Sequence, residues 1–347
     1  MAFKDIIGQD RAVNILRRTI QRERIPSSYL FAGESGIGKK FTAVNLAKTL
    51  NCQNPPSPPF RKGGLGGFEI DCCDECSSCK KIDAGVHPDF LLIAPEGGQI
   101  RIEEIRAIDD ILSFKPFEGR KKIVIIDEAD TMNPYAANAF LKTLEEPPKD
   151  SLIILISSNP DRLPDTIRSR CSRVNFTPLS KEACGKVIKT VSSQQSTKQY
   201  PRLSTLVRLS MGRPGLAISE DLIEERAWFI KLLQGVLNAE KDGWTSKEEM
   251  ERWFDLILIL LRDMAIIKIT QDETNLINID LKDYIEELSK SVDLRDIIEN
   301  YQKLNTLRGY LNFNLNRSLT WNYTGAILRK TMEAFVKDSP LRSQRLH

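Results

Sequence analysis

Apolar residues in the first half of the chain form short runs that alternate with helical patterns. Four runs predict strands, at Ser28–Ala32, Phe90–Ile93, Lys122–Ile126 and Leu152–Ser157. The last two runs are continuously apolar, as expected of strands that are buried on both faces. The periodicity of residues 11–24 and Phe41–Leu50 predicts helices. Strands that alternate with helices indicate a parallel α/β sheet over residues 1–177.

Helical patterns alone continue beyond Pro178, with breaks near Arg213-Pro214-Gly215 and Asp242-Gly243. Gly and Pro are the residues that most often interrupt helices. We therefore expect a small helical domain at residues 178–238 and a second helical domain at residues 239–347.

Residues 54–68 differ in composition from the rest, since NPPSPPFRKGGLGGF holds four Pro and four Gly. Such a segment cannot form a packed helix or strand, so it predicts a flexible surface loop. Loops absorb extra length at little cost, which favours a tolerated insertion. The alternative is a Pro-rich ligand for the groove of a partner.

Composition is typical of a globular protein and excludes an overall polybasic or polyacidic chain. The 347 residues are 41% hydrophobic and 28% charged, with a net charge of +3. The most apolar stretch, Phe254–Ile267, is short and carries three charged residues. The first ten residues hold no apolar core of a secretory signal. We expect a cytoplasmic protein with no membrane partner, and the net charge gives no support for tight independent binding to DNA.

A glycine-rich segment follows the first predicted strand and precedes a helix. Gly33, Gly38 and Lys39 match G-x-x-x-x-G-K, and Gly36 lies between them. Glycines let backbone N–H groups turn toward phosphates, and the lysine meets phosphate charge. The next position should carry the Ser or Thr hydroxyl that binds Mg²⁺, but here it is Lys40. The sequence therefore predicts a phosphate loop with a damaged metal site.

Two further polar segments end apolar strands. Asp127 and Glu128 follow Lys122–Ile126 directly, as do the carboxylates that hold Mg²⁺ and polarise water in P-loop ATPases. Asn159 follows the next strand, where a polar side chain would orient water near a γ-phosphate. Together with the glycine loop, they predict a nucleotide site.

Seven cysteines are present, and four of them fall within residues 72–79. Clustered cysteines in a cytosolic chain favour a local metal site over a disulfide framework. Four thiolates suit a closed, tetrahedral, structural Zn²⁺ site. A redox switch is the alternative for this cluster.

Three segments resemble the clamp-loader subunits of bacterial DNA polymerase III, which are AAA+ proteins. Residues 138–148, NAFLKTLEEPP, resemble the N-x-L-L-K-x-L-E-E-P-P stretch of that family. Residues 167–171 resemble its I-R-S-R-C segment, and residues 7–9 resemble its V-G-Q box. The resemblance implies a RecA-like AAA+ core, a helical lid and a helical collar that contacts partner subunits. Asn314–Leu319 resembles a stretch of the collar, and the apolar run Leu256–Leu261 favours assembly.

The resemblance also implies site residues. Cys52 with Cys73, Cys76 and Cys79 resembles the family's inserted zinc module, here spread over residues 52–79. Cys72 competes with Cys52 for the fourth ligand position. In the family, the arginine of S-R-C, which is Arg170 here, reaches across a subunit interface to a neighbour's ATP as an arginine finger. The implied partners are gamma/tau and delta subunits, the sliding clamp and primed DNA within the assembled complex.

Two departures indicate the role within the family. Lys40 replaces the metal-binding hydroxyl, and Gly215 stands where ATPase members carry a nucleotide-sensing arginine, with Arg213 two positions early. Both weaken the chain's own ATP site, so ATP or ADP binding stays open while hydrolysis is not expected. Arg170, which would serve another subunit, is present. We therefore favour the delta-prime stator branch over the alternatives, a catalytically active gamma/tau-type ATPase and a zinc-containing AAA+ adaptor of another complex.

Overall fold

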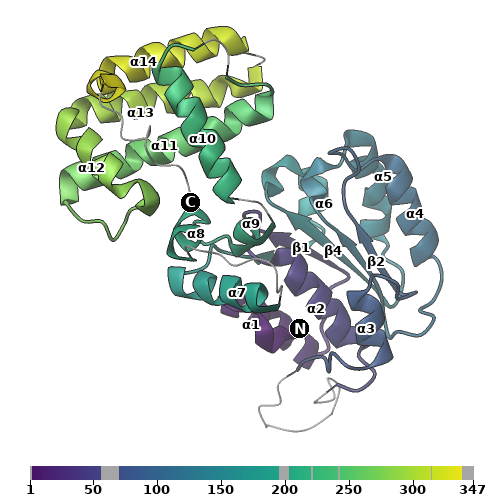
Figure 1. Ribbon diagram of the computed structural model, residues 1–347. Coiled ribbons are helices and arrows are strands. Elements are labelled where there is room, and N and C mark those ends of the chain that lie inside the picture. The colour runs from purple at the N-terminus through teal and green to yellow at the C-terminus, as the bar shows by residue number, and fades with distance from the viewer. Residues whose placement is uncertain are drawn as a thin grey trace. The chain divides into compact units, whose positions relative to one another are not determined.

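A computed structural model describes residues 2–55, 70–194, 203–219, 222–240, 243–313 and 315–337 (Figure 1). The Pro/Gly segment therefore lies almost wholly outside the described residues, as does Asn314 of the collar stretch. Contacts group the chain into two compact units, residues 1–199 with 212–218, and residues 200–211 with 219–347. Each unit is described separately below.

The first unit contains a five-stranded parallel sheet in the order β2-β3-β4-β1-β5 (Figure 1). Its strands are β1 (Ser28–Ala32), β2 (Phe90–Ile93), β3 (Lys122–Ile126), β4 (Ser151–Ser157) and β5 (Ser172–Asn175). Every residue of β1, β3 and β4 is buried, as their apolar runs predict. The predicted α/β core followed by helices is confirmed. The sequence analysis missed β5, an edge strand in which only Val174 is buried.

Helices cover both faces of the sheet. Those of the first unit are α1 (Asp10–Gln21), α2 (Lys39–Asn51), α3 (Ser77–Asp83), α4 (Ile102–Leu112), α5 (Pro134–Glu145), α6 (Asp165–Arg168), α7 (Lys181–Gln194) and α9 (Pro214–Ser219). One face packs on α4, α5 and α6, with Phe140 of α5 fully buried among strand residues. On the other side, α1 contacts β5 and α2 contacts β3 and β4. The result is a three-layer unit that presents its loops at the ends of the strands.

The second unit is a helical bundle. It comprises α8 (Leu203–Leu209), α10 (Leu222–Leu237), α11 (Lys247–Thr270), α12 (Lys282–Ser291), α13 (Leu294–Gly309) and α14 (Arg317–Lys337). The long helix α11 contacts both α12 and α13. Ser246 caps its first turn, because the Ser246 side chain accepts a hydrogen bond from the Glu249 N–H. None of the described helices is both long enough and apolar enough to cross a bilayer.

Tryptophans organise the core of this bundle. The rings of Trp244 and Trp321 meet edge to face, with centroids 4.8 Å apart. A Cβ atom at Gly243 would lie 2.2 Å from the Trp321 ring, so only glycine fits there. The sequence break at Asp242-Gly243 therefore marks a close approach of the backbone to an aromatic ring.

One expectation for the helical half changes with the structure. The apolar run Leu256–Leu261 does not form an assembly surface, because Ile257, Leu260 and Leu261 are fully buried in the bundle's own core. Helix α10 packs on α14, so the contacts join residues 222–237 to the C-terminal helices. The three-domain division at residues 177 and 238 stays a prediction.

Candidate functional site

The phosphate loop lies at the carboxyl end of β1 and leads into α2. Gly33, Gly36 and Gly38 have φ values of 149°, 78° and 96°, which favour glycine. Glycines in such conformations let successive backbone N–H groups point into one concavity that can bind an anion. Because β1, β4 and β3 are neighbours in a parallel sheet, their carboxyl ends share one edge. That edge brings the loop near the residues that follow β3 and β4.

Lys39, the loop lysine, folds back over the loop. Its Nζ atom donates hydrogen bonds to the carbonyl oxygens of Gly33 and Glu34, and the residue is only 6% exposed. Burial lowers the pKa of Lys39 to about 8, against the opposing effect of nearby carboxylates led by Asp127. The ammonium is therefore bound to the backbone of the loop itself.

Lys40 reaches across to the end of β3. Its Nζ atom lies 3.2 Å from Oδ2 of Asp127, and the two side chains are 49% and 19% exposed. The lysine that replaces the metal-binding hydroxyl thus pairs with the carboxylate expected to hold the metal. The hydroxyl of Thr42 is no substitute, because it is buried and donates to the Gly38 carbonyl.

Glu128 and Asn159, the other predicted site residues at the strand ends, are both exposed. Glu128 is exposed and adopts a left-handed conformation with φ of 47°. Asn159 is also exposed, and the described contact to this end of β4 comes from Asp130, which accepts from the Ser158 N–H at 3.2 Å. The roles of Glu128 and Asn159 stay predictions.

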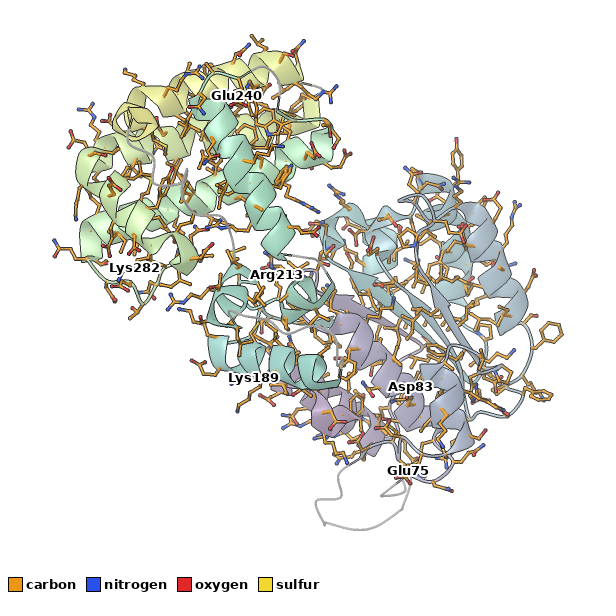
Figure 2. The ribbon with its side chains drawn as sticks, in the orientation of Figure 1. Glu75, Asp83, Lys189, Arg213, Glu240 and Lys282 are labelled. Atoms are coloured by element: carbon orange, nitrogen blue, oxygen red, sulfur yellow. The ribbon has the colours of Figure 1, made fainter. Side chains whose placement is uncertain are left out.

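The start of α9 and the residue before it pack directly on the phosphate loop. The Gly215 N–H donates to the Gly36 carbonyl at 2.8 Å. The Arg213 guanidinium lies 3.6 Å from the Glu34 carboxylate (Arg213 is labelled in Figure 2). The family resemblance aligns Gly215, not an arginine, with the residue that senses nucleotide. Arg213, two positions earlier, nevertheless lies beside the loop.

Replacing Gly215 with alanine is expected to destabilise the first unit by about 1–3 kcal/mol. A Cβ atom there would lie 2.8 Å from both Cα and O of Gly36, and backbone atoms cannot move aside cheaply. Thermal unfolding followed by circular dichroism measures the change. Gly309→Ala is the control, because a Cβ at Gly309 meets nothing within 4 Å. An equal melting temperature for both variants would contradict the close approach.

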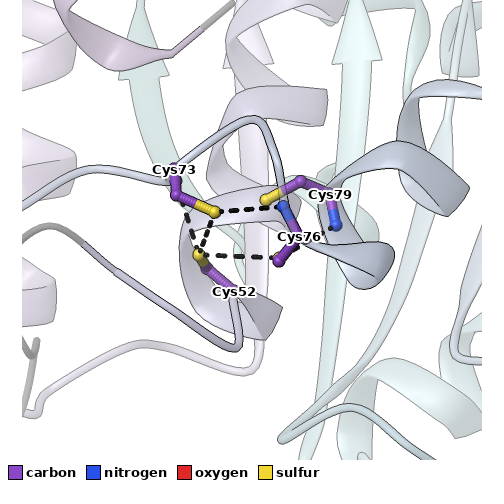
Figure 3. A group of neighbouring side chains, drawn as sticks. All are labelled: Cys52, Cys73, Cys76 and Cys79. Atoms are coloured by element: carbon purple, nitrogen blue, oxygen red, sulfur yellow. Dashed lines mark hydrogen bonds between the residues drawn. The ribbon is translucent and has the colours of Figure 1, made fainter.

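The cysteine cluster joins the end of α2 to the start of α3. Cys52 follows α2, Cys76 precedes α3 and Cys79 lies within it. The sulfur atoms of Cys52, Cys73, Cys76 and Cys79 all lie within 4.8 Å of one another (Figure 3). Four sulfurs around a tetrahedral Zn²⁺ would be about 3.8 Å apart, given Zn–S bonds of about 2.3 Å. The sulfur of Cys52 lies 3.5 Å from that of Cys73 and 4.0 Å from that of Cys76, which matches this spacing.

Backbone amides also favour thiolates in this cluster. The N–H groups of Cys73, Cys76 and Cys79 donate to sulfur atoms within the cluster. Burial raises the pKa of Cys76, but hydrogen bonds from the Cys79 and Gln53 backbones outweigh it and bring the value to about 6. The residues present therefore fit a structural Zn²⁺ ion.

Cys72 is buried but does not join the converging group. Its thiol donates to Asp74 at 3.4 Å, and a hydrogen bond to Cys72 also raises the pKa of Cys79. Asp74 and Asp83 both pair with the buried Lys48, at 2.6 and 3.0 Å (Asp83 is labelled in Figure 2). All seven cysteines are free of disulfides.

Arg170 lies between α6 and β5. Its guanidinium contacts the Glu145 carboxylate at 2.6 Å and the Thr166 carbonyl at 2.9 Å, and its side chain is 36% exposed. Ser28, the first residue of β1, donates to the Arg170 carbonyl. Arg170 is thus near the start of β1, whereas the phosphate loop follows its end.

Comparison with known proteins identifies the family. Residues 8–180 match a family model described as "DNA polymerase III, delta subunit". DNA polymerase III subunit delta' of Bacillus subtilis is 33% identical over 277 residues, which cover 76% of this chain and 79% of that protein. The chain belongs to the DNA polymerase III delta-prime family. The delta' subunit of Pseudomonas aeruginosa is 31% identical and covers similar shares, 75% and 78%.

The chain is also similar to the longer tau subunits. DNA polymerase III subunit tau of Bacillus subtilis is 31% identical over 68% of this chain, which spans only 40% of that protein. Among solved structures, a gamma subunit-related protein of Thermotoga maritima aligns with a TM-score of 0.40 and 20% identity, covering 92% of this chain and 98% of its own. At that TM-score the family assignment depends on the sequence relatives.

Proposed function

We propose that this chain is the delta-prime stator of the DNA polymerase III clamp loader. In this role it supports ATP-driven loading of the sliding clamp onto primed DNA without hydrolysing ATP itself. The observation that carries the proposal is the contrast between two basic residues. Lys40, next to the chain's own phosphate loop, pairs with Asp127 at the end of β3, whereas Arg170 lies at the opposite end of β1.

The strand register supports a role for Arg170 in another subunit's site. Strand β5 runs parallel to β1, with Ser172 beside Tyr29 and Asn175 beside Ala32. Five strand residues span about 16 Å, at about 3.3 Å each. An arginine before β5 therefore cannot reach the loop after β1, but it is exposed to a neighbouring molecule. Guanidinium is always charged and bidentate toward phosphate, which suits an arginine finger.

Assembly with partners is supported by apolar side chains on the surface of the second unit. They lie on α13, on α14 and between these helices, at Tyr301, Tyr310, Phe313, Leu319 and Tyr323, with exposures of 38% to 73%. Exposed apolar residues in such numbers are typical of surfaces that bind other proteins. The proposed partners are gamma/tau and delta subunits, the sliding clamp and primed DNA held within the complex.

A gamma/tau-type ATPase is the second candidate. It is favoured by the retained Lys39, Asp127 and Glu128, and by Arg213, which lies against the loop. Such an enzyme would have to hydrolyse ATP with Lys40 in place of the metal-binding hydroxyl, although an ammonium has no lone pair for a metal.

The purified chain alone is expected to hydrolyse ATP no faster than its Lys39→Ala variant. Loss of a metal ligand removes the ion that stabilises charge on the transferred phosphoryl group. Steady-state phosphate release measures the rate. Hydrolysis that disappears in the Lys39→Ala variant would favour the gamma/tau-type ATPase and contradict the stator.

Native mass spectrometry of the tagged chain from its own host tests the partners. One copy beside several motor subunits would support the stator. A homo-oligomer would favour the motor, and failure to associate with gamma/tau and delta subunits would indicate an adaptor of another complex.

A further inference from the structure

Three basic side chains lie at the phosphate loop, and each one contacts an oxygen atom of the loop or of the residue that follows β3. Lys40 pairs with Asp127, and Arg213 lies 3.6 Å from Glu34. Lys39 donates to the carbonyls of Gly33 and Glu34. All three belong to the first unit, so their arrangement does not depend on how the two units are placed.

The donor set does not fit the divalent cation that ordinarily accompanies nucleotides in a P-loop. Such a cation needs a hydroxyl directly after the loop lysine and a carboxylate at the end of β3. Lys40 supplies no lone pair, and its charge repels a cation. Asp127 already faces that ammonium, and the Thr42 hydroxyl is engaged with Gly38.

From this mismatch we propose that the loop binds nucleoside di- and triphosphates without a divalent cation, with the Lys40 ammonium standing in the cation's place. A bound polyphosphate would exchange with Asp127 as the partner of Lys40. It would likewise replace the loop carbonyls at Lys39.

The charges and exposures make this exchange favourable. Lys39, Lys40 and Arg213 provide three basic side chains that can pair with the charged oxygens of a polyphosphate without a metal. The Lys40–Asp127 pair is partly exposed, and ion pairs of that kind contribute little to stability. Burial lowers the pKa of Lys39 to about 8, and a phosphate beside it would favour the charged ammonium.

In this proposal the loop binds a nucleotide without hydrolysing it. A damaged ATPase site, in contrast, would bind no nucleotide. It does not rest on the stator function, because an adaptor or a stator could equally hold a nucleotide. Phosphate transfer is not part of it, since Asp127 faces an ammonium and the site lacks the metal's hydroxyl ligand.

Isothermal titration of the full chain with ADP and with ATP tests the proposal, once with millimolar Mg²⁺ and once with excess EDTA. The wild-type chain is expected to bind with dissociation constants that agree within about twofold between the two conditions, since its charge is built in. Binding that requires Mg²⁺, or the absence of binding in both conditions, would overturn the proposal.

Lys40→Thr restores the hydroxyl and removes the ammonium. In EDTA its binding is expected to weaken about tenfold, and Mg²⁺ should recover it. Lys40 is about half exposed, so the variant should fold, and Lys40→Gln tests the loss of charge without a metal ligand. Lys115→Thr is the matched control, an exposed lysine before β3 at the opposite edge of the sheet. A Lys40→Thr variant that binds as the wild type does in EDTA would refute the role of the ammonium.

The readouts distinguish this proposal from the stator function. Nucleotide binding is measured on the chain alone, whereas the stator function is measured by assembly and by the effect of Arg170 on a complex. Either result can fail while the other holds.

Discussion

Replacing Arg170 with alanine is expected to slow ATP hydrolysis at the adjacent motor site by about a thousandfold, while assembly stays intact. The guanidinium would stabilise charge that develops on the transferred phosphoryl group, and alanine supplies none. The residue is partly exposed and its carbonyl, not its side chain, accepts from Ser28, so the fold does not depend on it. ATPase and clamp-loading rates of the reconstituted complex measure the effect.

Two variants make the result specific. Arg173→Ala removes an exposed arginine on β5, whose Nε donates to Asn175, and should leave both rates unchanged. Glu145→Gln weakens the ion pair that holds Arg170 but keeps the guanidinium, so rates should not fall below wild type. Rates of the Arg170→Ala complex equal to those of wild type would refute the arginine finger.

Replacing Cys79 with serine is expected to reduce bound zinc from one ion per chain to almost none and to lower the melting temperature. Structural Zn²⁺ contributes about 10–16 kcal/mol to the folding of zinc-finger peptides, so loss of the ion is expected to reduce stability strongly here. The cluster ties α2 to α3, and hydrogen exchange should rise in residues 70–84. Elemental analysis and exchange mass spectrometry measure these changes.

Other cysteines serve as controls. Cys184 is fully buried outside the cluster, so Cys184→Ser should keep its zinc. Comparing Cys52→Ser with Cys72→Ser identifies the fourth ligand, and only the Cys52 variant should lose the ion. A wild-type chain that contains no zinc when purified under reducing conditions would contradict the metal site.

Local pattern was sufficient for the strands that are buried on both faces. The predicted bounds of β1, β2 and β3 match the structure, because continuous apolar runs have few other uses in an α/β protein. Strand β5 could not be found in this way. Its side chains are mostly exposed, and only its pairing with β1 makes it a strand.

Residue type was sufficient to single out the candidate chemistry but not its arrangement. In the sequence, Lys40 and Asp127 are two unrelated features. Lys40 departs from the phosphate-loop pattern, and Asp127 is a retained carboxylate. Their ion pair depends on β3 and β1 lying one strand apart in the sheet. The sequence analysis likewise expected no contact between Arg213 and the loop, because Arg213 lies two positions before the aligned residue. In the structure its guanidinium lies 3.6 Å from the Glu34 carboxylate.

Residue types and their order along the chain were sufficient to predict the class of fold, the phosphate loop, the cysteine cluster and the family, since each depends on residues close together or in a fixed order. Folding of the whole chain determined which of these groups come into contact. It joined Cys52 to Cys73 across 20 intervening residues, buried Leu256–Leu261 in the bundle's own core and separated Arg170 from the phosphate loop by the length of β1. These outcomes depend on contacts between distant segments, and such contacts follow from packing a whole chain around its core.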